Sequence, residues 1–414
     1  MFDLLIQNAN IPGGQTGLDI AVADGRIASI DRNIPANKAR EVIDAGGHLV
    51  SPGFVDSHMH LDKVLSLGDT ESKTLDAAIR NFTLYLQGIP AGMLGEDIRR
   101  RAEQVIRLAV SSGTTALRTN ANVEAASGLQ GIQALNELKE HVRDVVDIRI
   151  TCLPNFYDGP EAQEQRLQLI DQACGEGLID FVGGANHHHD NCAELTERLF
   201  KIAVKHDLPV DFHVDESDEP NIAEFEQVAR LTMEHGYEGR VSCGHVTALN
   251  AVDDVTAARA IEHARKADLN IITLPSCNLY LMGRTDKQPI RRGVTRIREF
   301  VEAGVNIAYA SDNIRDPFRP LGNADMLEEG LLTAQVAQMV TTSELETVFA
   351  MGTVNGARAM GLTDYGLAPG KRADLVIFDA TSAPEALLSQ AIRTHVIKNG
   401  RVVARNSVTA ELLF

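Results

Sequence analysis

The residues best suited to chemistry in this chain begin with two histidines that one residue separates. His58 and His60 follow an apolar run and lie in the segment 56–62, Asp-Ser-His-Met-His-Leu-Asp. Spacing of i and i+2 on an extended backbone points both imidazoles to the same side. Two such rings can bind one metal ion, although the same pair taken alone also fits a surface or a core position.

Four more candidates stand where other apolar runs end. His213 ends one run and Glu216 follows it by three residues, while His245 and Asp312 end two later runs. Imidazoles together with a carboxylate suit Zn²⁺ or Fe²⁺ and leave one coordination position for water. Each residue taken singly fits an ordinary rim position, and Glu216 fits the start of a helix. Their joint position at run ends favours a metal site.

The elements that must position these side chains alternate along the chain. Eight apolar runs typical of strands cover residues 48–55, 114–118, 148–153, 180–184, 209–213, 240–244, 269–274 and 306–310. Amphipathic patterns typical of helices separate them, for example at 129–145, 194–205, 222–234, 252–266 and 294–303. Eight such βα units predict an α/β fold with a closed, TIM-like (β/α)8 barrel, whose active site lies at the carboxyl ends of the strands. Residues 64–95 are longer than an ordinary loop and could cover that face as a lid.

Both ends of the chain have a different character. Short alternating runs flank an Asp-Gly turn and an Asn-Gly turn, at 19–23, 26–30, 373–378, 394–398 and 401–404. Such patterns predict β-hairpins. We expect residues 1–50 and 366–414 to pair in one small β-sandwich domain, and residues 51–365 to form the barrel.

Composition limits the class of protein. The 414 residues are 44% hydrophobic, and 57 acidic against 39 basic residues give a net charge of −18. This surplus repels phosphate and anionic lipid, so we expect neither nucleic acid nor a membrane as a partner. The N-terminus lacks the basic start of a signal peptide, and no apolar run approaches the ~20 residues that span a bilayer. Five cysteines without a CxxC pair indicate no disulfide framework, and a cytoplasmic location is expected.

The segment 52–62, Pro-Gly-Phe-Val-Asp-Ser-His-Met-His-Leu-Asp, resembles the first-strand motif of the amidohydrolase superfamily. Later segments resemble its cytosine deaminase branch, and they lie at 213–216, 278–284, 291–295 and 312–317. The resemblance implies one divalent ion, Zn²⁺ or Fe²⁺, with the ligands His58, His60, His213 and Asp312. It assigns proton transfer and polarisation of the substrate to Glu216 and His245.

The absence of a lysine bears on the number of ions. Other members of the superfamily bind two metals that a carbamylated lysine on the fourth strand bridges, and this chain has no lysine between Lys139 and Lys201. We therefore expect one ion per chain. Asp312 would accept a proton from the water that the ion activates, and hydroxide would attack a ring carbon that carries an exocyclic nitrogen. Glu216 would protonate the adjacent ring nitrogen, while His245 stabilises the new oxygen.

Two asparagines depart from the cytosine deaminases. Asn155 stands where that branch has a glutamine, and Asn313 stands where it has a second aspartate. Because both positions would touch the substrate, the change alters the hydrogen bonds that the pocket offers. Cytosine itself is therefore not the expected substrate.

Other positions suggest a different substrate or a solvated loop. The segment that contains Lys63 and the one that contains Asn313 resemble enzymes that remove an alkylamine from N-isopropylammelide. An ion pair with Asp62 explains the presence of Lys63 equally well. His187 matches a pocket histidine of the cytosine deaminases. The neighbouring His188 and His189 have no such match and are expected in a solvated loop.

These observations predict a metal-dependent deaminase that hydrolyses an exocyclic C–N bond of a small nitrogen heterocycle and releases ammonia. An alternative is an N-alkylammelide aminohydrolase that releases an alkylamine from a triazine. A more distant alternative is a non-catalytic barrel that acts as a binding or assembly protein, but all four ligand positions, Glu216 and His245 are present. The substrate, the native ion and the assembly state stay open, with a homo-oligomer among the alternatives.

Overall fold

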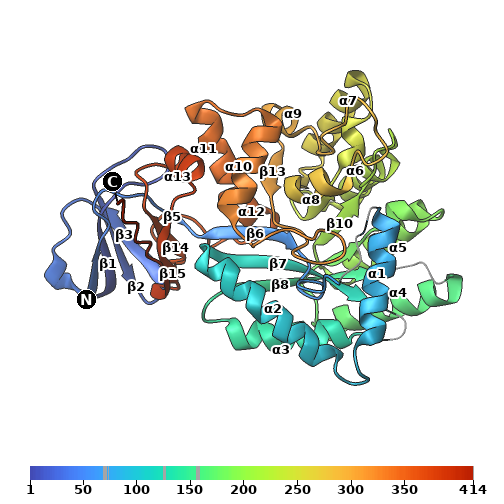
Figure 1. The fold of residues 1–414 in the computed structure, drawn as a ribbon, viewed down its shortest axis with the longest axis horizontal. Coiled ribbons are helices and arrows are strands. Elements are labelled where there is room, and N and C mark those ends of the chain that lie inside the picture. The colour runs from blue at the N-terminus through green and yellow to red at the C-terminus, as the bar shows by residue number, and fades with distance from the viewer. Residues whose placement is uncertain (69–71, 73, 125–126, 155–158, 414) are drawn as a thin grey trace.

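Figure 1 shows the fold of the chain in a computed structural model, which describes residues 1–68, 72, 74–124, 127–154 and 159–413. Strands from both ends of the chain lie together at the left of the view, and alternating strands and helices fill the centre and the right. The candidate residues for chemistry belong to the second group.

Eight strands of this second group form two parallel sheets, with the orders β6-β7-β8 and β13-β12-β11-β10-β9. Their bounds are Phe54–Met59 (β6), Thr114–Val123 (β7), Asp147–Pro154 (β8), Val182–Gly184 (β9), Val210–Val214 (β10), Val241–His245 (β11), Asn270–Thr273 (β12) and Asn306–Tyr309 (β13). Single parallel bridges connect the outer strands of the two sheets, one between Met59 and Asp312 and one between Thr151 and Phe181. The predicted α/β class with parallel strands is confirmed.

The first predicted strand, 48–55, is wrong as a single element. The chain forms β5 (Val50–Pro52), which pairs antiparallel with a strand from the C-terminal end, and then β6, which pairs with β7. Gly53 separates the two, and a Cβ there would lie 2.3 Å from Cγ2 of Thr115, so only glycine allows this close passage. As a result His58 lies within β6 rather than beyond its strand.

Helices lie between these strands and after them, and the last helix lies between two strands of the C-terminal end. Their bounds are Leu75–Gly88 (α1), Leu94–Ser111 (α2), Gln130–Val142 (α3), Pro160–Gly175 (α4), Cys192–His206 (α5), Ala223–His235 (α6), Asp254–Lys266 (α7), Pro275–Leu281 (α8), Ile297–Glu302 (α9), Met326–Ala337 (α10), Thr342–Met351 (α11), Val354–Ala359 (α12) and Ala383–Ser389 (α13). Short 3₁₀ helices lie at Ala36–Lys38 (η1), Asn186–His188 (η2) and Thr247–Asn250 (η3). Buried residues such as Leu195 and Leu199 of α5 recur at helical spacing and join the main apolar core. The predicted helix 294–303 is shorter, because residues 294–296 form an irregular, mostly buried segment before α9.

The two ends of the chain form two four-stranded sheets, β3-β2-β1-β4 and β16-β15-β14-β5. The new strands are Phe2–Ala9 (β1), Leu18–Ala23 (β2), Arg26–Asp31 (β3), Ala39–Asp44 (β4), Leu375–Phe378 (β14), Arg393–Lys398 (β15) and Arg401–Arg405 (β16). Both predicted hairpins are confirmed, and their turns have positive φ at Asp24 and Gly25 and at Asn399 and Gly400. Apolar side chains from both ends share one buried cluster, which contains Leu4, Ile20, Leu375 and Ile397.

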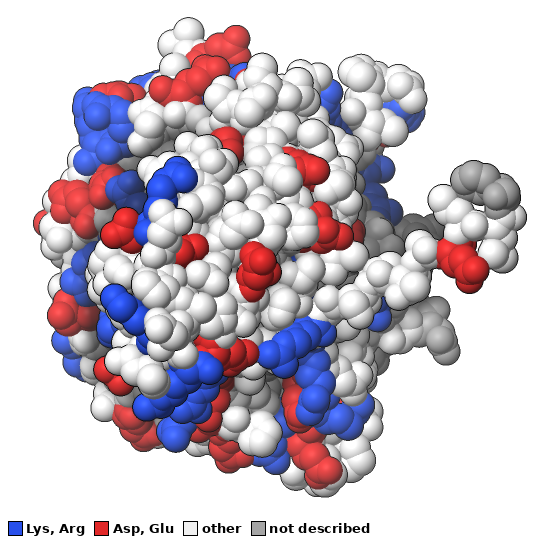
Figure 2. Space-filling view, turned by 90° about the vertical axis from the view of Figure 1, so that its left-hand side faces the viewer, with Lys and Arg blue, Asp and Glu red and all other residues white. Residues whose placement is uncertain are grey.

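Charged side chains are mixed on the face of the molecule that the terminal strands help to form. Figure 2 shows Lys and Arg side chains interspersed with Asp and Glu side chains on that face. The acidic surplus of the chain is therefore not gathered there. In the part of the chain that the structure describes, no helix combines the length and the apolar character that a membrane span requires.

Candidate active site

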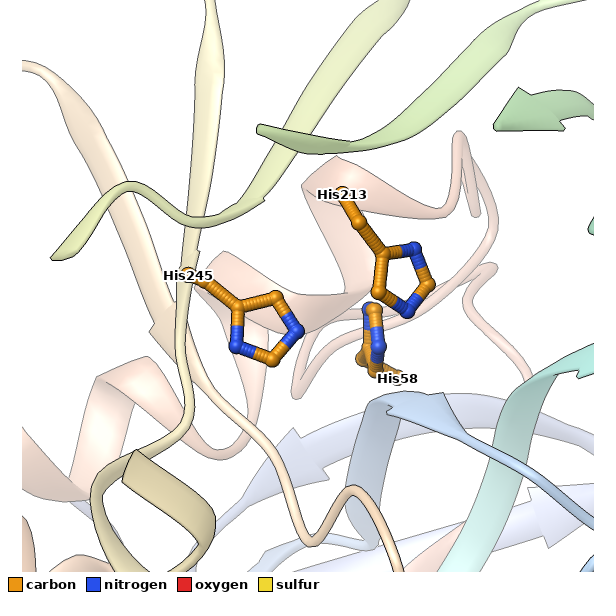
Figure 3. Close-up of side chains that lie close together, drawn as sticks. All are labelled: His58, His213 and His245. Carbon is orange, nitrogen blue, oxygen red and sulfur yellow. The ribbon is translucent and has the colours of Figure 1, made fainter. Parts of the chain in front are cut away.

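Six residues that the sequence singled out converge at the carboxyl ends of four parallel strands. His58 belongs to β6 and His60 follows that strand, while His213 belongs to β10 and Glu216 follows it. His245 ends β11, and Asp312 lies three residues after β13. None of the six is more than 8% exposed. Figure 3 shows the rings of His58, His213 and His245 turned toward one another.

Local sequence explains how these side chains reach the same place. Alternation along β10 places Asp211 and His213 on one face of the strand, and Phe212 on the other face packs into the apolar core. In the neighbouring strand Gly244 leaves room for a ring from β6, because a Cβ at that position would lie 3.1 Å from Cε1 of His58. The glycine therefore allows the imidazoles of different strands to approach closely.

The potential ligand atoms lie close together. Nε2 of His60 is 3.1 Å from Oδ1 of Asp312 and 3.4 Å from Nε2 of His213. Nε2 of His58 is 3.7 Å from Oδ1 of Asp312. Among the described residues, three sets of three have ligand atoms within 4.8 Å of one another: His58 with His60 and Asp312, His58 with His213 and His245, and Glu216 with His187 and His188.

Many of these buried atoms have no hydrogen-bond partner among the described residues. They are both ring nitrogens of His58, Nδ1 of His213, Nε2 of His245 and both carboxylate oxygens of Asp312. Buried polar atoms without partners are costly. A divalent ion bound to several imidazoles and one carboxylate would satisfy such atoms together. The donor set therefore fits a divalent metal ion.

Burial sets the protonation of the cluster. Desolvation, together with charged neighbours, holds the pKa of His58 and of His213 well below the usual range, and it lowers the pKa of His245 to about 4. These rings are therefore neutral at pH 7, which is the form that binds metals. Burial alone would raise the pKa of Asp312, but the imidazole of His60, whose Nε2 is 3.1 Å from Oδ1, and the other nearby histidines hold this pKa below the usual range.

Two of these residues have an uncommon backbone conformation. His245 has a φ of 66° and Asp312 a φ of 58°, both in the left-handed region that residues other than glycine rarely adopt. Such conformations persist only where surrounding contacts impose them, and they cluster at functional sites. The backbone therefore supports a functional role for these two strand ends.

Glu216 lies beside His245 at the edge of the cluster. Its Oε1 is 3.3 Å from Nδ1 of His245 and 3.5 Å from Nδ2 of Asn278. Burial and the charge of Asp312 raise the pKa of Glu216 well above its ordinary value. Asn278, which the sequence analysis did not single out, also has its Nδ2 3.0 Å from Nδ1 of His245. Its place at the start of the segment 278–284 was the available signal.

The buried side chain of Arg319 holds the loop that contains Asp312. The guanidinium of Arg319 donates to the carbonyl oxygens of Ser311 at 2.9 Å and Asn313 at 3.3 Å, on either side of Asp312. It also lies 3.2 Å from Oε1 of Glu329 in α10, and both partners of this ion pair are buried. Arg319 thus fixes the backbone on both sides of a potential ligand.

A cavity of about 710 Å³ opens above the cluster. Its lining includes His60, His213, Glu216, His245 and Asp312. Residues 64–95, the predicted cover of the site, contain α1, which contributes side chains to the same lining. The cavity gives a small molecule room next to the candidate ligands.

The predicted substrate residues have different positions. Lys63 lines the cavity, and its Nζ is 3.1 Å from Nδ1 of His60 and 3.5 Å from Oδ1 of Asp62. The lysine therefore lies beside the candidate metal site and also pairs with Asp62. Asn313 also lines the cavity, but its Nδ2 donates to Oδ2 of Asp316 at 2.7 Å. Asn155 lies outside the described residues.

The three consecutive histidines differ from the expectation. His187 is almost fully buried, with its Nδ1 3.2 Å from the carbonyl oxygen of His213 and 3.6 Å from Oε2 of Glu224. His188 and His189 are half-buried and line the cavity, whereas the sequence predicted a solvated loop at this place. The reason is the short turn η2, whose buried Asn186 donates to Thr196 and Glu224 and so anchors this segment beside the site.

Comparison with known proteins gives consistent matches along the whole chain. The model of the Amidohydrolase family matches residues 41–93 and 80–404. N-isopropylammelide isopropyl amidohydrolase of Pseudomonas sp. strain ADP is 30% identical over 98% of this chain and 98% of that protein. Pterin deaminase of Rhizobium rhizogenes is 29% identical over 97% of this chain and 94% of its own length.

Solved structures agree with these matches. The structure of 5-methylcytosine deaminase from Klebsiella pneumoniae, liganded with phosphonocytosine, has a TM-score of 0.91 at 29% identity and covers 99% of this chain and 100% of its own. N-isopropylammelide isopropylaminohydrolase from Burkholderia multivorans has a TM-score of 0.85 at 25% identity, with 98% and 99% covered. The similarity therefore extends over both groups of elements.

Proposed function

Because the chain belongs to the amidohydrolase family and is a hydrolase that acts on C–N bonds, we propose that it is a metal-dependent deaminase of a small nitrogen heterocycle. Family membership confirms the resemblance seen in the sequence. The observation that carries the proposal is the buried cluster of imidazoles and one carboxylate next to the buried carboxyl group of Glu216, whose pKa is raised, at the floor of a cavity. The bond that it would hydrolyse is an exocyclic C–N bond, with release of ammonia.

His58, His60, His213 and Asp312 would hold one divalent ion, Zn²⁺ or Fe²⁺. Their close ligand atoms and the absence of hydrogen-bond partners for several of them, among the residues described, support this assignment. Bound there, such an ion would supply Lewis acidity, which lowers the pKa of a water molecule and so provides a nucleophile at neutral pH.

The protein side chains would then move the protons. Among the described residues neither carboxylate oxygen of Asp312 has a hydrogen-bond partner, and Asp312 can accept the proton that the attacking water loses. Glu216 can donate its proton to the ring nitrogen next to the reacting carbon, which disperses the charge of the adduct. Nδ2 of Asn278 donates to Nδ1 of His245, which leaves the ring proton on Nε2, where it can stabilise the new oxygen. Asp312 would then pass its proton to the exocyclic nitrogen as the C–N bond breaks and ammonia leaves. Glu216 would regain a proton from the hydroxyl group of the adduct, which becomes the carbonyl oxygen of the product, so both carboxyl groups return to their starting states.

Lys63, Asn155 and Asn313 would bind the substrate directly, and His187, the fourth predicted substrate residue, would position a strand end beside it. The Lys63 ammonium group at the cavity wall suits a carbonyl or oxyanion of an oxygen-rich ring. Asn313 keeps one amide hydrogen beyond the bond to Asp316, and its Oδ1 accepts a hydrogen bond from Sγ of Cys277 at 3.9 Å. His187 contacts the backbone of His213, so it would act by holding that strand end.

The fold proposed for this activity is a closed (β/α)8 barrel in residues 51–365 with a small β-sandwich from residues 1–50 and 366–414. The two bridges between the parallel sheets support closure of the barrel. The apolar cluster shared by both chain ends supports the small domain. A closed barrel would bring all eight strand ends to one rim, where the candidate site lies.

A second candidate function is an N-alkylammelide aminohydrolase that releases an alkylamine. The 30% identity with a protein of that name and the position of Lys63 beside His60 favour it. A non-catalytic barrel is the weakest alternative, because every residue that the chemistry needs is present and buried at one place.

A screen of purines, pyrimidines, triazines and pterins with the metal-loaded protein tests the proposal. Ammonia and free amines are measured separately. Release of ammonia from an aminoheterocycle supports the deaminase, whereas release of an alkylamine only supports the second candidate. A folded, metal-loaded protein that releases neither product contradicts both.

A further inference from the structure

The cavity above the candidate metal site is larger than a single heterocyclic ring requires. Its volume is about 710 Å³, and cavities of about 300–1,000 Å³ hold ligands of drug size. Besides the strand-end residues, its lining contains apolar side chains and polar ones such as Gln87 and Gln130. The remaining lining therefore needs an explanation that the reacting ring does not give.

One face of α1 forms an apolar wall of this cavity. Ile79, Phe82 and Leu86 follow one another at spacings of three and four residues, which places them on the same helix face. Phe82 is 5% exposed, and the other two are half-buried. Leu153, Leu281 and Phe318, from other segments, form a second apolar wall of the same cavity. We call these six residues the apolar subsite.

The apolar subsite is continuous with the candidate metal site. Nζ of Lys63 is 3.1 Å from Nδ1 of His60 and 5.8 Å from the centre of the Phe82 ring. The rings of Phe82 and Phe318 are 6.3 Å apart, so the two walls meet near this lysine. A substrate with its reacting carbon at the strand ends would reach the apolar subsite with a short extension.

We propose that the apolar subsite binds an alkyl or aryl group that the heterocyclic substrate carries, an inference that rests on the proposed function. Apolar side chains on both walls favour carbon groups and disfavour charged ones. Each buried methylene should strengthen binding about three- to fourfold. The substrates are then alkylated or arylated aminoheterocycles rather than bare rings.

Calorimetric titration of the metal-loaded Glu216→Gln protein, in which turnover should be slow, tests this inference. The ligands are two series, N4-alkylcytosines and N-alkylammelides, each with hydrogen, methyl, propyl, butyl and benzyl groups. We expect Kd to fall about three- to fourfold per methylene up to butyl in at least one series. The heat-capacity change of binding should become more negative along that series, as burial of apolar surface requires.

Matched variants on one helix locate the effect. Leu86→Ala should reduce the ratio of butyl to methyl affinity about tenfold, and Ile79→Ala provides a second wall variant if the first does not fold. Leu84→Ala makes the same change on the same helix at a side chain that is 63% exposed and outside the cavity lining, so it should leave the ratio unchanged. Thermal unfolding of each variant confirms that it is folded.

The inference and the proposed function can fail separately. Three results would overturn the inference: a Kd that does not depend on the length of the alkyl group, a failure of both series to bind, or equal effects of Leu84→Ala and Leu86→Ala. The proposed function still stands in that case if the metal-loaded wild type releases ammonia from an aminoheterocycle. Binding that depends on the length of the alkyl group and that Leu86→Ala weakens, in a wild-type protein that releases ammonia from no aminoheterocycle, supports the apolar subsite and counts against the proposed reaction.

Discussion

The surroundings of Glu216 bear most directly on the proposed reaction. Its buried carboxyl group lies 3.3 Å from His245, and burial together with Asp312 raises its pKa well above the ordinary value. A glutamine has nearly the same shape but cannot deliver a proton to a ring nitrogen. We therefore expect Glu216→Gln to keep the fold and the metal while kcat falls by about 10²–10⁴-fold. Steady-state kinetics at matched metal content measure the loss.

Glu219→Gln is the control for this change, because Glu219 is exposed and only three residues away. It should leave kcat within about twofold, as expected for a surface substitution away from the site. Turnover close to that of the wild type in a metal-loaded Glu216→Gln protein would instead assign Glu216 a structural role at the end of β10.

At the scale of single residues, the sequence predicts the site residues that lie at strand ends. It does not predict residues whose role depends on contacts between distant segments. His58, His213, His245 and Asp312 could be found because each follows an apolar run, and parallel strands bring such positions to one rim. Asn278 could not, because its role depends on a contact with His245 that only the folded chain creates. Solvated positions for His188 and His189 were expected since a polar run after a strand resembles a loop, whereas η2 turns both toward the cavity.

Among the elements, the segment after β13 depends on a buried arginine. Arg319 donates to the carbonyl oxygens on both sides of Asp312 and pairs with Glu329 of α10. Loss of one partner of a buried ion pair costs about 3–5 kcal/mol. We expect Arg319→Met to lower the free energy of unfolding by this amount and to reduce metal occupancy, because Asp312 loses the contacts that fix its backbone. Urea unfolding and elemental analysis measure the two effects.

Two further variants separate these effects from a general loss of arginine. Arg319→Lys keeps a positive charge opposite Glu329 and should recover part of the stability but fewer carbonyl contacts. Arg315→Met changes an exposed neighbour and should retain full metal occupancy. Equal metal content in Arg319→Met, Arg315→Met and the wild type would show that Arg319 does not position Asp312.

Element types were predictable where the pattern is local. The alternation of apolar runs and amphipathic stretches gave the parallel strands and most helices, and the Asp24-Gly25 turn gave a hairpin. The division of 48–55 into β5 and β6 was not predictable, because β5 pairs with β14 more than 300 residues later. A local pattern contains no information about such a partner.

In the whole molecule, one aspartate connects the strands of the C-terminal end to the parallel sheets. Asp147 at the start of β8 accepts a hydrogen bond from Nζ of the buried Lys398 in β15 at 2.8 Å, and it also pairs with Arg372. Burial alone would raise the pKa of Asp147, but these two cations hold it below its ordinary value of 3.8. Asp147→Asn should therefore lower the free energy of unfolding at pH 7.

The sign of the pH dependence follows from the lowered pKa. The stabilisation by the Asp147 carboxylate is fully present above pH 3.8, its ordinary pKa, and is lost as the pH falls through the lower folded pKa. The difference in melting temperature between wild type and Asp147→Asn should therefore narrow below about pH 4. Asp144→Asn, at an exposed position, should show little difference at any pH. A constant gap between pH 7 and pH 3 for Asp147→Asn would refute the electrostatic origin.

Metal stoichiometry tests the proposed site most directly. The protein is freed of metal with a chelator, and Zn²⁺ or Fe²⁺ is added back in small steps while ammonia or amine release is measured on the best substrate of the screen. We predict activity that rises linearly and reaches its plateau at one ion per chain, and a His213→Ala protein that shows no such plateau because a ligand is missing. Full activity in the metal-free protein, or a plateau at two ions per chain, would contradict a single catalytic ion held by His58, His60, His213 and Asp312.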